Sequence, residues 1–174
     1  MKLFTKIAAL LFAAWVVPAY ATVIGTSIYN GHTYYLLDGK PWLNQEAEAV
    51  TLGGHLVTIN DAAENTWVWD TFGVTGTGLF IGFNDAASEG TYGWSSGEAV
   101  SFTNWRAGEP NNCCGGEDFG ELASDYMWND VGPNHTWRAV VEVTPVTVPE
   151  PSSLLLMLAA MGSLVVFTKR RAAG

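Results

Sequence analysis

The 174-residue sequence has a formal net charge of −9 at pH 7, and five of its eight basic residues lie in the two terminal segments. Between Thr22 and Glu150, only Lys40, Arg106 and Arg138 oppose all 17 acidic residues. A surface this acidic argues against nucleic acid or an anionic membrane as the domain's partner, because like charges repel. With both ends set aside, about 120 residues remain, which is enough for one domain with its own core.

The first 21 residues have the pattern of a secretory signal peptide. Two lysines precede an apolar run over residues 7–17, and a small–x–small triplet that ends at Ala21 provides the cleavage site. A membrane anchor is the alternative, but the apolar run is short for one. We therefore predict export, with residues 22–144 forming the mature domain.

The C-terminal end combines a proline-rich linker with an apolar and basic tail. The linker, residues 145–153, contains Pro149-Glu150-Pro151, and residues 154–174 hold a 14-residue apolar run followed by a basic cluster. This order resembles the PEP-CTERM sorting signal of bacterial exported proteins. The resemblance implies a membrane-anchored precursor with transient membrane association through the tail, cleavage by a sorting enzyme of the exosortase type, and delivery to the cell surface or extracellular matrix. A plain C-terminal anchor is the alternative, although a full bilayer crossing needs ~20 apolar residues.

A hairpin and a helix are predicted at the start of the domain. Two β-rich runs, residues 24–29 and 32–37, flank Asn30-Gly31, a dipeptide typical of a tight hairpin turn. Pro41 is typical of the first turn of a helix, and Gly53-Gly54 of its end. One face of this predicted helix carries Leu43, Ala47 and Val50.

A second helix follows a short buried strand at residues 56–59. Asn60 or Asp61 is suited to cap this helix, with Glu64 as the capping-box partner. The residues spaced for its buried side are Ala63, Trp67 and Phe72.

After Gly78, short apolar pieces at residues 79–83, 92–94 and 139–143 alternate with long polar loops. Two helices followed by short strands and a long irregular region predict an α+β fold. These loops are ordered rather than disordered, because disordered segments lack aromatic residues. The relevant tryptophans are Trp94, Trp105, Trp128 and Trp137.

The stretch 104–130 concentrates oxygen ligands. Its carboxylates are Glu109, Glu117, Asp118, Glu121, Asp125 and Asp130, and its amides are Asn104, Asn111, Asn112 and Asn129. Arg106 is its one positive charge. Calcium accepts six to eight oxygens from such side chains and from water. A solvated acidic loop is the alternative interpretation.

An ordered set of motifs resembles the C-type lectin-like domain from about Tyr29 to Val143. The motifs, in chain order, are the 53–59 segment GGHLVTI, the 60–65 segment, Phe80-Ile81-Gly82, Trp105, Glu109-Pro110-Asn111 and Trp128-Asn129-Asp130. The set is most similar to the calcium-dependent, mannose-type branch. The resemblance implies an α+β fold with two helices, small antiparallel sheets and a long calcium-binding loop region.

The resemblance also implies roles for individual residues. The principal calcium ligands would be Glu109, Asn111, Glu117, Asn129 and Asp130, and the first four of these would also contact the sugar. Pro110 matches a proline that the family holds in cis, and Trp128 matches a core residue. An auxiliary calcium site would use Asp85, Glu89, Asn112 and Asp118, together with Glu117; the alternative is that residues 85–89 form an ordinary turn.

The cysteines depart from the family pattern. The family has two disulfides in this region, but the four corresponding positions hold Ala49, Phe119, Pro133 and Val141. The only cysteines, Cys113 and Cys114, are adjacent within the predicted metal loop. A bridge between neighbours is geometrically awkward, so free thiols and pairing with another chain are the alternatives.

The sequence therefore predicts an exported, calcium-dependent glycan-binding protein with specificity for mannose, N-acetylglucosamine, glucose or fucose. The alternative keeps the fold but binds protein, or has a structural role in the matrix, without calcium. An enzyme is not predicted. Paired carboxylates can hydrolyse glycosides, but nothing in the sequence marks such a pair, and no hydrolase or phosphate-loop motif is present.

Overall fold

A computed structural model describes residues 22–145 of the chain. Its elements in order are β1 (Val23–Tyr29), β2 (His32–Leu37), α1 (Trp42–Thr51), β3 (His55–Leu56), α2 (Ala62–Phe72), β4 (Leu79–Asn84), β5 (Gly93–Trp94), β6 (Phe119–Leu122), β7 (Trp128–Val131) and β8 (Arg138–Val143). The predicted signal peptide and the tail from residue 146 onward, with its sorting motif, lie outside the described residues. Neither helix in the described part is long and apolar enough to cross a membrane.

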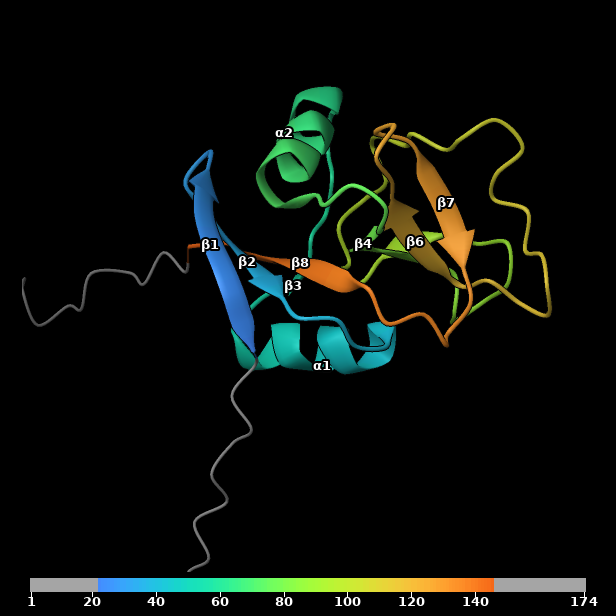
Figure 1. Ribbon diagram of the computed structural model, residues 1–174, viewed down its shortest axis with the longest axis horizontal. Coiled ribbons are helices and arrows are strands. Elements are labelled where there is room, and N and C mark those ends of the chain that lie inside the picture. The colour runs from blue at the N-terminus through green and yellow to red at the C-terminus, as the bar shows by residue number, and fades with distance from the viewer. Residues whose placement is uncertain (1–21, 146–174) are drawn as a thin grey trace, which may run out of the picture.

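The strands form one sheet, with β1, β2, β8, β4, β6 and β7 as its main order. All pairings are antiparallel except that of β4 with β8, which aligns Leu79 with Arg138 and Phe80 with Ala139. This parallel contact joins the small antiparallel sheets that were expected into a single one. The two helices lie on opposite sides of β1, β2 and β8 (Figure 1), which confirms the α+β prediction.

The predicted hairpin is present between β1 and β2. Asn30 and Gly31 have φ values of 48° and 86°. A two-residue hairpin turn of the type that matches strand twist requires positive φ at both positions, which Asn and Gly tolerate. The turn pairs Tyr29 with His32 and sets the register of both strands.

Helix α1 presents a different face to the core from the one that carries Leu43, Ala47 and Val50. Leu43 is 62% exposed and Val50 is 55% exposed. The buried residues of the helix are Trp42, Gln45 and Ala49. The Trp42 ring stacks on Phe119 with centroids 4.7 Å apart, and its Nε1 donates to the Ile81 carbonyl at 2.8 Å. These contacts turn the face of the helix that carries Trp42 toward the core.

Helix α2 begins with the predicted cap. The Asp61 carboxylate accepts from the Glu64 backbone N–H at 2.8 Å, and Glu64 Oε2 accepts from the Asn60 N–H at 2.9 Å. The predicted buried side is only partly right, because Ala63 is exposed and Trp67 is half-buried, whereas Phe72 is buried. The helix buries Glu64 and Asn65 instead, since both make polar contacts inside the domain.

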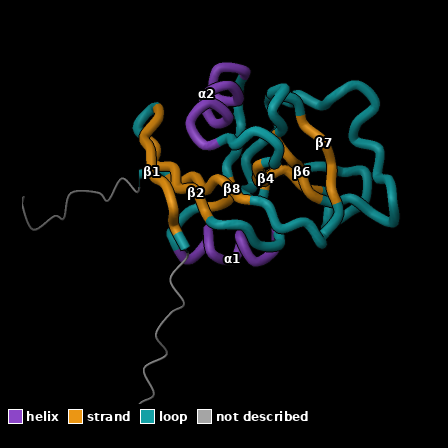
Figure 2. Tube along the Cα trace, in the orientation of Figure 1, coloured by secondary structure: helices purple, strands orange, loops and turns teal. Residues whose placement is uncertain are grey.

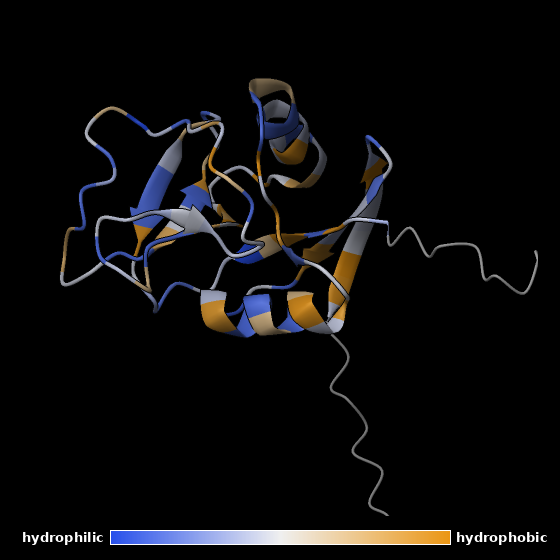
Figure 3. Cartoon of the chain, turned by 180° about the vertical axis from the view of Figure 1, so that it is seen from behind, coloured by the Kyte–Doolittle hydropathy of each residue, from blue (hydrophilic) through white to orange (hydrophobic). Residues whose placement is uncertain are grey.

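Two apolar clusters form the core. The first mixes aliphatic and aromatic residues, and the aromatic ones include Tyr34, Phe83, Trp94 and Trp128. Three of the residues at the missing-cysteine positions, Ala49, Phe119 and Val141, are buried in the second, and the fourth, Pro133, is exposed. Figure 3 shows hydrophobic residues along the central strands and mainly hydrophilic or neutral ones in the large loop beyond β6 and β7. Both clusters lie between Tyr29 and Val143, so the described region holds a complete core.

The region expected to be long and irregular is only partly so. Strands β6 and β7 lie inside it and pair from Phe119 with Val131 to Leu122 with Trp128. Strand β6 has the sequence FGEL and lacks a β-rich run, so local propensity does not reveal it. Its pairing with β4 and β7 makes it a strand.

Candidate functional site

The candidate site lies in the loop between β5 and β6, beside the β6–β7 hairpin (Figure 2). The start of this loop is attached to β7. The Trp128 N–H donates to the Asn104 carbonyl at 2.8 Å, and the Arg106 N–H donates to the Trp128 carbonyl at 2.8 Å. The loop thus enters the site next to Asn129 and Asp130.

Trp128 forms the floor of the region. It is fully buried, and its ring contacts Phe83, Trp94 and Trp105 at centroid distances of 5.4 to 5.9 Å. Its Nε1 donates to Asn65 Oδ1 of α2 at 2.7 Å. The two polar residues that follow Trp128 on β7 are therefore held by the core.

Asp130 joins β7 to the loop. It is fully buried, and its two carboxylate oxygens accept from the backbone N–H groups of Asn111 at 3.1 Å and Asn112 at 2.8 Å. The Tyr92 hydroxyl donates to the Glu117 carbonyl at 3.0 Å and lies 3.5 Å from Asp130 Oδ2. Burial, and then the charge of Asp130, raise the pKa of Tyr92, so it remains a neutral donor.

The sequence alone does not mark Tyr92 as a site residue. It lies 25 residues before Glu117, and no motif connects the two. Only the fold brings its hydroxyl to the loop.

Two further predicted ligands share one hydrogen-bond donor. The Cys113 N–H lies 2.9 Å from Asn111 Oδ1 and 2.9 Å from Glu117 Oε2. The Glu117 N–H donates to Asn112 Oδ1 at 2.8 Å, which closes the loop on itself. The oxygens of Asn111 and Glu117 therefore face the same point of the backbone.

Among the predicted calcium ligands, Glu109 has the fewest hydrogen-bond partners for its carboxylate. The Glu109–Pro110 peptide bond is cis. The residue as a whole is half-buried, but its Oε2 is buried and has no hydrogen-bond partner. Desolvation raises the pKa of Glu109, and contact with Asp130 and the charge of Glu117 add to the effect, while Arg106 opposes it. Negative charge gathers here without full compensation.

Asn129 occupies the fifth predicted position. Its Nδ2 donates to the Asp130 carbonyl at 2.8 Å and lies 3.4 Å from Glu121 Oε2. Burial raises the pKa of Glu121, which is 9% exposed. Because Nδ2 is committed to these acceptors, the orientation of the Asn129 amide is set by the protein.

The auxiliary set is partly assembled. The Asp85 N–H donates to the Asp118 carbonyl at 3.1 Å, and Asp85 Oδ2 accepts from the Gly90 N–H at 2.7 Å. Asp85 Oδ1 is buried without a partner, as Glu109 Oε2 is. Asn112 Oδ1 is already used by the Glu117 N–H, and Glu89 is exposed.

No three His, Cys, Asp or Glu side chains in residues 22–145 converge as a ready-made metal cluster. The three carboxylates of the predicted calcium set, Glu109, Glu117 and Asp130, are therefore not drawn together as such a cluster, and the set also depends on the amides of Asn111 and Asn129. Its chemistry suits a hard cation that takes carboxylate and amide oxygens. The unpaired oxygens of Glu109 and Asp85 are consistent with that fit.

Cys113 and Cys114 are free thiols, and both are exposed. A hollow of about 260 Å³ lies beside them, lined by residues 113–117 and 132–135. The pKa of the Cys113 thiol is raised to about 12, first by the adjacent Cys114 thiol and also by Glu117. Cys113 is therefore a neutral thiol at pH 7.

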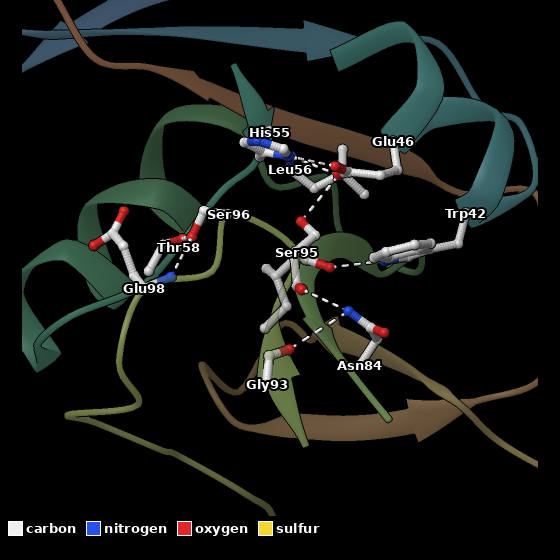
Figure 4. Close-up of polar contacts among 12 residues, drawn as sticks. Trp42, Glu46, His55, Leu56, Thr58, Asn84, Gly93, Ser95, Ser96 and Glu98 are labelled. Atoms are coloured by element: carbon white, nitrogen blue, oxygen red, sulfur yellow. Dashed lines mark hydrogen bonds and ion pairs between the residues drawn. The ribbon is translucent and has the colours of Figure 1, made fainter. Parts of the chain in front are cut away.

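A second hollow, of about 280 Å³, lies beside β3, Ser96 and Glu98, and shares no lining residue with the first. Figure 4 shows Glu46 of α1 pointing toward His55, with its carboxylate 2.6 Å from the imidazole Nδ1 and accepting from Ser95 Oγ at 3.0 Å. Thr58 Oγ1 meets Ser96 Oγ at 2.7 Å in the same view. These contacts join α1 to β3 and to the segment after β5, which is a structural role.

The sequence matches the Lectin C-type domain family over residues 38–140, which is more than half of the chain. The chain belongs to the C-type lectin family. Residues 147–171 match the PEP-CTERM protein-sorting motif, which confirms the resemblance of the tail. Membership of a lectin family also agrees with the prediction that this C-type lectin is not an enzyme.

Two relatives show the extent of the likeness. A perlucin-like protein of Mytilus galloprovincialis is 37% identical over 114 residues, which is 62% of this chain and 72% of the relative. An alpha-N-acetylgalactosamine-specific lectin of Patiria pectinifera is 36% identical over 131 residues, covering 68% and 77% of the two chains.

Solved structures agree with the fold. The mouse scavenger receptor C-type lectin carbohydrate-recognition domain superposes with a TM-score of 0.64 at 26% identity, covering 68% of this chain and 95% of that one. The C-type lectin CEL-I of Cucumaria echinata has a TM-score of 0.63 at 27% identity, with 68% and 94% covered. The predicted C-type lectin-like fold is thereby confirmed.

Proposed function

We propose that this C-type lectin is an exported carbohydrate-binding protein that holds its glycan through calcium, at the cell surface or in the extracellular polysaccharide matrix. The residues that would hold calcium are Glu109, Asn111, Glu117, Asn129 and Asp130. Calcium, when bound, supplies a hard cation to which neighbouring sugar hydroxyls can bind. The remaining chemistry belongs to the side chains of this loop.

The observation that carries the proposal is the state of Glu109. Its Oε2 is buried without a hydrogen-bond partner, and it contacts Asp130 and lies near Glu117. An unpaired buried charge is costly, and in proteins such groups are paired or bind metal. A divalent cation at this place would offset two of the three negative charges. Arg106 cannot do so, because its guanidinium is engaged with Asp125 at 2.9 and 3.0 Å.

Sugar recognition would follow from the donors and acceptors of four residues. The carboxylates of Glu109 and Glu117 only accept hydrogen bonds, whereas the Asn111 amide can also donate, and Asn129 Nδ2 would donate to the sugar in place of its 3.4 Å contact with Glu121. A pair of neighbouring hydroxyls can therefore donate to one type and accept from the other. Single sites of this open kind bind weakly, at ~4 kcal/mol or millimolar affinity.

The proposed specificity is of the mannose type, which includes N-acetylglucosamine, glucose and fucose. It rests on Glu109 and Asn111 around Pro110, the pattern that resembles the mannose-type branch. The Patiria relative is named for alpha-N-acetylgalactosamine, so overall identity does not decide the sugar. The side chains at positions 109 and 111 would.

We further propose that the auxiliary set binds a second calcium ion. Asp85 supports this, since its buried Oδ1 lacks a partner and its backbone is bonded to Asp118. Asn112 in place of an aspartate lowers the negative charge of the set. Occupancy at this second site therefore needs more calcium than at the first.

The sorting motif at residues 147–171 supports export and surface delivery. The proposed route is removal of the signal peptide after Ala21, transient anchoring through residues 154–174, and cleavage by a membrane-embedded enzyme of the exosortase type near Pro149-Glu150-Pro151. Delivery can be followed by the size and location of the chain in cells with and without that enzyme. A full-length chain left in the membrane in both cells would contradict the route.

Thermal melting of residues 22–145 in calcium and in chelator tests the metal. A ligand at 100 times its dissociation constant should add ~2.7 kcal/mol to the free energy of unfolding, because it binds only the folded state. Identical melting in both conditions, with no calcium bound at equilibrium dialysis, would remove the basis of the proposal.

A double substitution tests the sugar contacts. Glu109→Gln with Asn111→Asp should move retention from mannose resin toward galactose resin, because the donors and acceptors exchange places around Pro110. The matched control, Glu98→Gln with Asn44→Asp, makes the same chemical changes at two exposed positions and should leave retention unchanged. Equal retention of both variants on mannose resin would count against the assigned contacts.

One observation favours the calcium-independent alternative. The oxygens of Asn111, Glu117 and Asp130 already accept backbone N–H bonds, so much of the loop is satisfied without a cation. A lectin-like domain that binds protein or serves a structural role in the matrix would use such a loop as a fixed surface. Full binding to its target in chelator, with no sugar competition, would select this alternative.

A further inference from the structure

The proposed function does not use the two adjacent cysteines. Cys113 and Cys114 are the only cysteines in the sequence, and both are exposed. Gly115 and Gly116 follow them with φ values of 108° and 117°, and nothing lies within 4 Å of where their side chains would be. The thiols therefore sit on an open part of the loop that another molecule can approach.

A bridge between the two neighbours is disfavoured by geometry. Consecutive Cα atoms are about 3.8 Å apart across a trans peptide. Disulfides usually join Cα atoms ~4.4–6.8 Å apart, and departures from this range store strain. Since the sequence has no third cysteine, an unstrained disulfide needs a cysteine from another molecule.

The surroundings of the pair suit a second copy of this chain. Residues 113–116, Cys-Cys-Gly-Gly, carry no charge, although the domain around them is strongly acidic. Two such loops can meet through these uncharged residues, while the Glu117 carboxylate beside them is held by the Cys113 N–H at 2.9 Å. The hollow beside the pair, which Pro133 and His135 also line, leaves room for the partner's loop.

We propose that Cys113 and Cys114 join two copies of this C-type lectin by intermolecular disulfide bonds. In a two-fold arrangement, Cys113 of one copy meets Cys114 of the other, and the reverse, so two equivalent bonds form. Each bond takes two thiols and one molecule of a disulfide oxidant such as glutathione disulfide, and releases two molecules of the reduced oxidant. Exported proteins meet the oxidising conditions in which such bonds persist.

The bond would bring two sugar sites together. The Cys113 N–H contacts Asn111 Oδ1 and Glu117 Oε2, so the linked loops are the ones that carry the proposed ligands. This consequence rests on the proposed sugar site, while the disulfide itself rests only on the proposed export. Two linked sites that reach one glycan surface gain avidity of about 10²-fold or more over a single site.

The test uses residues 22–145 in a glutathione redox buffer with calcium, quenched with iodoacetamide and analysed by non-reducing gel and intact mass. The expected product has twice the mass of the chain, returns to monomer with dithiothreitol, and contains a Cys113–Cys114 cross-link between peptides. Cys113→Ser with Cys114→Ser should lose the dimer, and so should each single variant alone, because every bridge joins Cys113 of one copy to Cys114 of the other. A mixture of the two single variants should form a dimer with one bridge.

A matched control places one cysteine elsewhere. In the double-serine background, Ser124→Cys creates an exposed thiol on the β6–β7 turn, and this variant should remain monomeric over the same time. Dimerisation of the control at the rate of the native pair would overturn the inference. So would a monomer lighter by two hydrogens, a glutathione adduct, or unreacted thiols as the main product.

Retention on mannose resin separates this inference from the proposed function. The dimer should show an apparent dissociation constant about 10²-fold lower than the reduced chain does on a dense resin. A dimer that forms but is not retained would overturn the sugar site and leave the disulfide standing. A chain that is retained but never dimerises would overturn the disulfide and leave the sugar site standing.

Discussion

Asn65→Ala is expected to destabilise the domain through a single hydrogen bond beneath the site. Asn65 is 2% exposed, and its Oδ1 accepts from Trp128 Nε1 at 2.7 Å. Its Nδ2 donates to the Tyr126 carbonyl, but that carbonyl also accepts from Asn104 Nδ2 at 2.6 Å. The substitution therefore leaves one buried group without a partner, the indole N–H of Trp128.

An unsatisfied buried donor costs ~1–3 kcal/mol. For a domain of this size, the melting temperature should fall by roughly 4–15 °C. Alanine has a higher helix propensity than asparagine, which offsets the loss by at most ~0.7 kcal/mol. The net effect remains a destabilisation.

Urea unfolding of four chains provides the assay: wild type, Asn65→Ala, Trp128→Phe and the double variant. In the Trp128→Phe background, which lacks the indole N–H, Asn65→Ala should lower the free energy of unfolding by clearly less, because no donor is left unpaired. Asn44→Ala, at an exposed position of α1, should change stability by no more than ~0.5 kcal/mol. The reasoning is refuted if Asn65→Ala costs the same in both backgrounds.

The same structure supports three further predictions. Gly54→Ala should lower the free energy of unfolding in urea by about 3 kcal/mol or more, because its Cβ would overlap a carbonyl oxygen of β8. Gly53→Ala, in open space at φ 86°, should lower it by only ~1–2 kcal/mol. Equal losses for the two variants would contradict this. Glu121→Gln should raise the melting temperature at pH 7, because burial raises the pKa of Glu121 and its charged form is disfavoured in the fold. This gain should shrink as the pH falls through the raised pKa, and a gain independent of pH would argue against the cause. Tyr34→Phe should cost ~1.5–3 kcal/mol at pH 7, since the hydroxyl donates to the buried Glu64 carboxylate at 2.7 Å. Burial raises the pKa of Glu64, so the cost should be smaller in acid, and denaturant melts at pH 7 and pH 4 compare the two.

Local chemistry let the sequence predict several elements correctly. Asn30-Gly31 marks a hairpin because both residues tolerate positive φ, and Asp61 with Glu64 marks a helix start because their oxygens satisfy free backbone N–H groups. Each depends on a few neighbouring residues. The order of the lectin motifs could likewise be recognised from the sequence alone, and the family match confirms the predicted resemblance.

Some properties depended on contacts between distant residues. On α1, the residues at 43, 47 and 50 and those at 42, 45 and 49 both have helical spacing, so periodicity alone does not choose a face. The stack of Trp42 on Phe119, 77 positions later in the sequence, decides it. Strand β6 is a strand only because β4 and β7 pair with it.

In the candidate site, too, some properties come from the sequence and others from the tertiary structure. The sequence by itself determined which oxygens are available, because ligand chemistry belongs to the residue types at 109, 111, 117, 129 and 130. Only the tertiary structure decided that Glu109 Oε2 has no partner, that Tyr92 reaches the loop, and that both thiols are open to solvent. The physical reason is that burial and pairing are properties of the space around an atom, and in this domain segments far apart in the chain fill that space.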